Sequence, residues 1–217
     1  MTKPVNRALW GLCAFLSVGV AIVSYRYLAP AAAPTLAPEI LANLFAKPWL
    51  NIHIAGAATA LLLGPFQFLS GLREKHWQLH RWMGRVYVVS CIVGGIGGFI
   101  MAFGSTAGPI ATVGFATLSI CWVTANVQGW RMVLARRFAE HRAWMIRSFA
   151  MTFAAVNLRI YVLLLPLTGL TDLQSYIATA WISWIPNLIL VELYMRGAFR
   201  RHAPPTAYNP SNSAVDT

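Results

Sequence analysis

Six long apolar segments divide this sequence, and they restrict the chain to a membrane-spanning fold more than any other feature does. A helix needs roughly 20 mainly apolar residues to cross the hydrocarbon core of a bilayer. Each segment meets this length, and short polar stretches separate them. The predicted spans cover residues 8–28, 49–69, 83–103, 109–130, 144–167 and 173–195. We therefore predict an all-α polytopic transmembrane bundle of six helices, forming one domain over residues 1–200.

The composition agrees with that fold and excludes several classes of function. Hydrophobic residues make up 58% of the chain and charged residues 11%, which is not the balance of a soluble globule. The formal net charge is +11, but the basic residues lie between apolar segments instead of forming the single face or arm that nucleic acid requires. We expect the lipid bilayer as partner and no nucleic acid. No residues are predicted to be catalytic.

The basic residues predict how the chain is oriented, because Lys and Arg near the ends of spans are retained on the cytoplasmic side. Fourteen lie on one side and only Arg26 and Lys47 on the other. The fourteen are Lys3, Arg7, Arg73, Lys75, Arg81, Arg85, Arg131, Arg136, Arg137, Arg142, Arg147, Arg196, Arg200 and Arg201. This count predicts that both chain ends are cytoplasmic in a multi-pass protein of an inner or cell membrane.

Two segments are not predicted to pack. The proline-rich stretch 29–38 is expected to be an exposed loop, and residues 201–217 a disordered tail. We expect the first span to present mainly lipid-facing surface. An alternative for this span is a cleaved signal peptide ending near Ala31 or Ala33, since Lys3 and Arg7 precede it and small residues follow it.

Two histidines begin different spans with the same local pattern. His80 and His141 each stand in a His-Arg-(x)-Trp-Met-x-Arg sequence where the chain enters the membrane. Two imidazoles from facing helices can supply both axial bonds of a b-type haem. The GlyGlyIleGlyGly run at 94–98 admits the close approach of either a flat cofactor or another helix. His80 and His141 are therefore candidate haem ligands; iron within haem is the only metal predicted.

Four arginines beside these histidines are candidate partners for the propionates of such a haem. They are Arg81, Arg85, Arg142 and Arg147. The alternative is that the histidines and arginines only anchor the protein at the headgroup level, where such residues are common. The fourth span contains no histidine, so a second haem with two histidine ligands is not expected.

A second group of polar residues lies within the spans. His53 and Arg159 are predicted at comparable depth near the outer side, and Gln67 shares a helix face with His53. An arginine within a span is costly and indicates an anionic partner. One interpretation pairs Arg159 with Asp172; the other gives Arg159 a bound quinone, lipid or substrate anion. His53, Gln67 and Arg159 are thus candidate substrate-binding residues in a polar interior.

Three stretches resemble one family. HisIleAlaGlyAlaAlaThrAlaLeuLeuLeuGlyProPheGlnPhe at 53–68, LeuHisArgTrpMetGlyArgValTyrVal at 79–88, and the segment 141–161 that begins HisArgAlaTrpMetIleArg are similar to the bacterial membrane proteins grouped as domain of unknown function 2306. The resemblance covers about residues 50–195 and implies a membrane protein without an established activity. It also implies that His53, Gln67, His80, Arg85, His141, Arg147 and Arg159 belong to the family's motifs. The layout is more distantly similar to cytochrome b561-type haem bundles.

Three hypotheses for function follow. The first is an electron carrier with one haem b between His80 and His141, exchanging electrons with a quinone or another membrane carrier. The second is a cofactor-free transporter or a lipid- or quinone-binding protein using His53, Gln67 and Arg159. The third is a structural subunit of a membrane complex.

Overall fold

The computed structural model describes residues 4–29 and 38–201, and within these ranges the chain is helical and contains no strand. The elements are α1 (Pro4–Tyr25), η1 (Arg26–Leu28), α2 (Pro38–Leu41), α3 (Ala46–Leu63), η3 (Pro65–Phe68), α4 (Ser70–Lys75), α5 (Trp77–Phe103), α6 (Pro109–Leu134), α7 (Phe138–Thr152), α8 (Ala154–Leu164), η4 (Leu165–Thr168), α9 (Asp172–Ile182) and α10 (Ile185–Arg201). Nearly all of the predicted tail at 201–217 and of the predicted loop at 29–38 lies outside the described residues.

Six stretches of helix are long and apolar enough to cross a membrane, which confirms the predicted class of fold. They are Arg7–Leu28, Ala46–Phe68, Trp77–Phe103, Pro109–Leu134, Phe138–Thr168 and Asp172–Gly197. The third and fifth begin about two turns earlier than the apolar segments do. His80 and His141 consequently lie within α5 and α7, with backbone amides that donate to His76 and Arg137 respectively.

The helix starts follow from local chemistry. Gly108 has φ +91°, a conformation that favours glycine, and Pro109 then opens α6 at the position where its missing N–H costs nothing. At α9 the Thr171 hydroxyl accepts from the Gln174 amide, and the Gln174 side chain accepts from the Thr171 amide. This reciprocal pair is a capping box and fixes the start of the sixth span.

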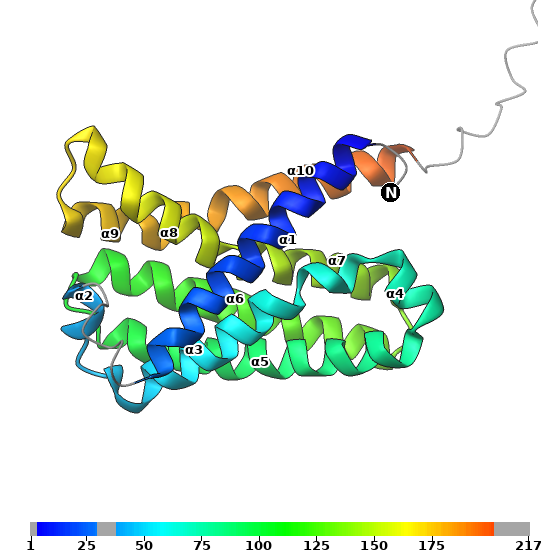
Figure 1. Cartoon of the computed structure of the whole chain (residues 1–217), viewed down its shortest axis with the longest axis horizontal. Coiled ribbons are helices and arrows are strands. Elements are labelled where there is room, and N and C mark those ends of the chain that lie inside the picture. Colours follow the sequence, from blue (N-terminus) through cyan, green and yellow to red (C-terminus); the bar gives the residue numbers. More distant parts are fainter. Residues whose placement is uncertain (1–3, 30–37, 202–217) are drawn as a thin grey trace, which may run out of the picture.

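Figure 1 shows α3, α5, α6 and α7 side by side, with α1 crossing obliquely over α3 and the segments α8 to α10 covering the rest. The N-terminus, α4 and the end of α10 lie at one end of the bundle. We call it the basic end, because most of the predicted cytoplasmic arginines lie there. Arg26 and Lys47 lie toward the other end, which we call the opposite end.

Glycines bring α3 and α5 into direct backbone contact. A Cβ added at Gly56 would lie 2.5 Å from the Gly94 amide nitrogen, and one at Gly97 would lie 3.0 Å from the backbone nitrogen of His53. On the same glycine run, a Cβ at Gly95 would meet Val123 of α6 at 2.5 Å. The glycines at 94–98 therefore admit neighbouring helices, not a flat cofactor. Close approach at small residues is a general means of helix association in membranes.

The fifth and sixth spans are each interrupted near their middle, which the apolar pattern did not predict. α7 gives way to α8 at Phe153, and α9 to α10 at Ser183 and Trp184. Two asparagines join the interruptions: Asn157 donates to the Ser183 carbonyl at 3.1 Å and to the Asn187 side chain at 2.8 Å. Asn187 in turn donates to a carbonyl of α7 at 2.9 Å. Carbonyls released from the helical ladder are thereby satisfied within the protein, as the bilayer requires.

Most of the first span is exposed, as predicted, but one narrow stripe of it packs against the bundle. Ser17, Ala21 and Ser24 are buried against the bundle. The Trp10 indole donates to the Pro65 carbonyl, and the Tyr25 hydroxyl bonds to Thr59 of α3 at 2.6 Å. The buried serines and alanine could not be recognised from the sequence, because the large apolar side chains on the exposed face dominate the mean hydropathy of the span.

Candidate functional site

A small cavity of about 60 Å³ lies where α1, α3 and α8 meet, nearer the opposite end of the bundle. Its polar lining comes from His53 of α3, Arg159 of α8 and Ser24 of α1, and its other lining residues are Ile54, Ala57, Ala58, Leu61 and Ala155. Alanines leave the space open because they have no atoms beyond Cβ. The structure thus brings together His53 and Arg159, two of the three residues predicted for a polar interior.

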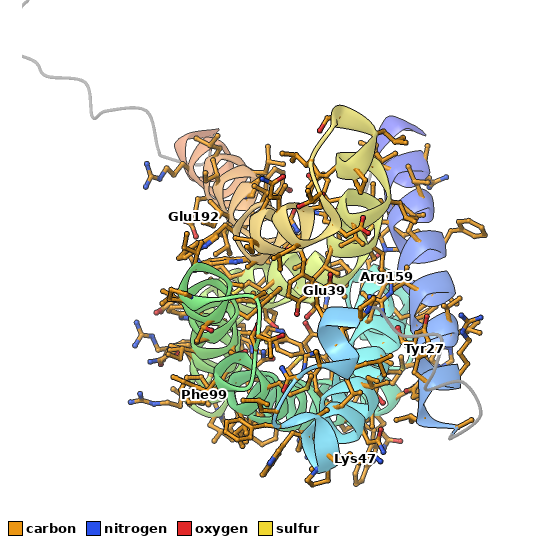
Figure 2. The ribbon with its side chains drawn as sticks, turned by 90° about the vertical axis from the view of Figure 1, so that its left-hand side faces the viewer. Tyr27, Glu39, Lys47, Phe99, Arg159 and Glu192 are labelled. Atoms are coloured by element: carbon orange, nitrogen blue, oxygen red, sulfur yellow. The ribbon has the colours of Figure 1, made fainter. Side chains whose placement is uncertain are left out.

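Arg159 points toward α1 and α3 (Figure 2) and is held there by two neutral oxygens. Its Nη1 donates to the Ala155 carbonyl at 2.8 Å, and its Nη2 donates to the Ser24 hydroxyl at 2.7 Å. In the described part of the chain, no carboxylate forms an ion pair with this guanidinium. The Arg159–Asp172 pair is therefore not formed; Asp172 is exposed at the start of α9.

His53 is fixed by the close packing of α3 on α5. Its Nδ1 donates to the Gly94 carbonyl at 2.8 Å. This arrangement needs a glycine at 98, because a Cβ there would lie 2.9 Å from the same nitrogen. In a neutral imidazole, the proton on Nδ1 leaves Nε2 as a hydrogen-bond acceptor. The site therefore combines a cation, Arg159, with an acceptor nitrogen.

Gln67 does not belong to this cavity. It lies in η3, fourteen positions after His53, which corresponds to about 21 Å along a helix. Its Oε1 lies against Gly84 of α5, 3.3 Å from where a Cβ would stand, and its Nε2 is buried without a hydrogen-bond partner. The helical periodicity placed Gln67 on the correct face but at the other end of that face.

His80 and His141 both lie at the basic end, and His80 is within electrostatic reach of His141 and of Arg73. His141 Nδ1 donates to the Gly129 carbonyl of α6 at 2.8 Å. His80 Nδ1 is buried and has no hydrogen-bond partner. Gly84, which Gln67 contacts, lies one turn beyond His80 on the same face of α5. Two buried polar atoms without hydrogen-bond partners, Gln67 Nε2 and His80 Nδ1, therefore face the same part of the basic end.

The four candidate propionate partners differ in what they contact. Arg147 is already paired: it donates two hydrogen bonds to Glu192 of α10, one of them at 3.1 Å. Arg81 and Arg85 lie over the rings of Trp77 and Trp82, at 5.3 and 4.9 Å from the ring centres. Arg142 is exposed. In Figure 2, Glu192 and Arg159 lie on different sides of the bundle, so this acid does not pair with Arg159.

Two residues that matter to these sites carried no clear sequence signal. Ser24 is an ordinary serine in an apolar span, 135 positions from the arginine that it contacts. Tyr87 is buried at the centre of the bundle, where its hydroxyl bonds to Ser148 at 2.9 Å and Thr152 at 3.0 Å. Only its position on the glycine-rich face of the third span could have indicated that Tyr87 is interior.

The fold and the cavity together define a six-span α-helical membrane protein with a cationic site inside the bundle. The model of one family, the predicted membrane protein family DUF2306, matches residues 50–195. The chain belongs to this family, and the match includes α5 to α9 and most of α3 and α10 but not α1. No curated protein and no solved structure was found to match the chain.

Proposed function

We propose that this protein binds an amphiphile whose anionic head group enters the cavity at Arg159. The observation that carries the proposal is a guanidinium inside a membrane span that lines a cavity and contacts only neutral oxygens among the described residues. Such an arginine is costly and by default indicates a function. An anionic oxygen would bind it about twice as strongly as a neutral one.

The size of the cavity limits the ligand to a head group. About 60 Å³ is room for a few water-sized groups, because one water molecule needs about 10–15 Å³ of such volume. This suits a carboxylate or phosphate head group but not an acyl chain. The tail would remain in the lipid. A fatty acid or an anionic phospholipid fits these limits, and a quinone could insert only a carbonyl oxygen. Binding of this kind would serve either a transporter or a lipid-binding protein.

The positions of the charges support a location for this site. Because basic residues are retained on the cytoplasmic side, the basic end would face the cytoplasm and the Arg159 cavity would lie in the outer half of a bacterial inner membrane.

The test is an isothermal titration calorimetry experiment in which oleate is added to the delipidated protein in detergent. Arg159→Gln is expected to weaken oleate binding by about tenfold or more, because a hydrogen bond to a charged group contributes about 1.5–3 kcal/mol. Arg26→Gln is the matched control: Arg26 is exposed and contacts the adjacent Tyr27, so its loss should leave the affinity unchanged. Equal affinity in wild type and Arg159→Gln would refute the proposal.

A second candidate function, electron transfer through one haem b, is favoured by a specific observation at the basic end. His141 donates from Nδ1 to a backbone carbonyl, which leaves Nε2 free and fixes the ring, as is usual for a metal-bound histidine. His80, on α5, lies within electrostatic reach of His141. His80 and His141 would hold the haem, and Arg81, Arg85 and Arg142 would pair with its propionates. A haem bound there would supply one-electron redox chemistry.

The absorption spectrum of the purified protein tests this candidate. If haem binds, the dithionite-reduced protein from haem-replete cells will show the sharp visible bands of a b-type cytochrome. His80→Ala and His141→Ala will then each remove those bands, whereas His53→Ala will retain them. A colourless wild-type preparation, or bands that survive both substitutions, excludes haem at this site.

A further inference from the structure

The wall of the Arg159 cavity has two different origins. His53 and Arg159 lie inside the part of the chain that matches the family, residues 50–195. Ser24 lies in α1, outside the match, yet it lines the same cavity and bonds directly to Arg159. The cationic site is thus built by the family core together with a helix from outside it.

α1 supplies one wall of the cavity through Ser24, and its opposite face is exposed. One of its faces carries Phe15 and Ile22, which are 75% and 61% exposed. Its other face carries Ala21, which packs with Ala58, Leu61 and Val156 in one buried cluster, and Ser24, which reaches Arg159. An amphiphile that keeps its tail in the bilayer would therefore approach Arg159 past α1.

The hydrogen bonds of Ser24 show what this residue does for Arg159. Its hydroxyl donates to the Val20 carbonyl at 2.6 Å, so the oxygen is free to accept from Arg159 Nη2 at 2.7 Å. The hydroxyl oxygen therefore occupies the position on the guanidinium that an anionic oxygen would otherwise take. It satisfies a donor that would be costly to leave unpaired inside a membrane.

We infer that Ser24 is a placeholder for the head group, and that binding of the amphiphile displaces Ser24 from Arg159 and moves α1 aside. This inference rests on the proposed function of the cavity. In this proposal α1 is a gate, and Ser24 competes with the head group for Arg159. Removing the Ser24 hydroxyl should therefore raise the affinity for the amphiphile, and a negative charge at position 24 should lower it.

The experiment measures oleate binding by Ser24→Ala, Ser24→Asp and Ser24→Thr. Ser24→Ala removes the competing acceptor and is expected to tighten binding about threefold to tenfold, the value of one neutral hydrogen bond. Ser24→Asp places a carboxylate on Arg159 and is expected to abolish binding. Ser24→Thr keeps the hydroxyl and should bind as wild type does. The matched control is Ser17→Ala, since the buried Ser17 hydroxyl lies two turns away on α1 and has no hydrogen-bond partner.

A folding control accompanies Ser24→Asp. If its carboxylate pairs with Arg159, adding Arg159→Gln will lower the thermal unfolding temperature far more in the Ser24→Asp background than in wild type. Repeating the titrations in lipid discs, with phosphatidylglycerol against phosphatidylcholine, separates a phospholipid ligand from a free fatty acid.

The outcomes distinguish the two proposals. Suppose that Arg159→Gln no longer binds oleate, whereas Ser24→Ala and Ser24→Asp bind it as wild type does. The ligand then uses Arg159 without displacing Ser24. This result would refute the gate but would support the proposed function. If Arg159→Gln binds as wild type, the proposed function itself fails. Tighter binding by Ser24→Ala together with lost binding by Ser24→Asp supports both.

Discussion

Replacing Gly56 with alanine is expected to cause one of the largest losses of stability that a single substitution can cause in this protein. The new Cβ would lie 2.5 Å from the Gly94 nitrogen and 2.6 Å from the Ser90 carbonyl oxygen. Both are backbone atoms of a helix, so no side chain can rotate away and α3 must separate from α5. Overpacking of this kind costs about 1–3 kcal/mol, occasionally more. Denaturation in mixed micelles of mild detergent and SDS would measure the loss.

Gly19→Ala is the matched control for that measurement. Gly19 lies within a span, in α1, but an added Cβ there meets nothing within 4 Å. Because alanine has the higher helix propensity, this variant should be as stable as wild type or slightly more stable. If Gly56→Ala is equally stable, the tight contact between α3 and α5 does not exist.

The spans could be predicted from the sequence because apolar length is a local property of the chain. The close approach at the glycine run 94–98 was also predicted, and Gly94 meets the backbone of Gly56 there. The sequence could not predict whether a helix or a flat cofactor packs against the glycine run at 94–98. A stripe of small residues indicates close approach but does not identify the partner. The partner of a helix face depends on helices distant in the sequence.

The candidate site was predictable in part. His53 and Arg159 could be placed at one depth by counting turns from the ends of their spans, and they share a cavity. Gln67 was grouped with them by angle alone, although its distance along the helix separates it. Ser24 was missed because a serine inside an apolar span has no distinctive pattern. Only the crossing of α1 over α3 brings it to Arg159 (Figure 1).

The arginines at the basic end show the same limit. Their number and spacing suited the propionates of a haem, but side chains of that length reach many partners. Arg147 pairs with Glu192, 45 positions away, and Arg81 and Arg85 lie over tryptophans four and three positions before them. The last two contacts are local and could have been read from helical spacing, whereas the first needed the fold.

Replacing Thr152 with valine is the other change expected to have a large effect, because one hydroxyl links α5, α6 and α7 at the centre of the bundle. The Thr152 hydroxyl accepts from the Trp122 indole at 2.9 Å and lies 3.0 Å from the Tyr87 hydroxyl. Tyr87 keeps Ser148 as a partner when Thr152 is lost, but the indole N–H of Trp122 is left buried and unpaired. Valine matches threonine closely in volume, so the experiment removes the hydrogen bonds without creating a cavity.

The expected cost is that of a buried unsatisfied donor, about 1–3 kcal/mol, which exceeds the average of about 0.6 kcal/mol for an interhelical hydrogen bond in a membrane. The larger value is expected because Trp122 is 6% exposed and its indole cannot find water or another acceptor without moving α6. Thr112→Val is the control, since the Thr112 hydroxyl bonds only to the carbonyl of Gly108 just before its own helix and should cost much less. Tryptophan fluorescence during denaturation in the same mixed micelles would measure both variants. Equal stabilities of Thr152→Val and Thr112→Val would mean that the central hydrogen bonds do not hold the three helices together, and that close packing alone does.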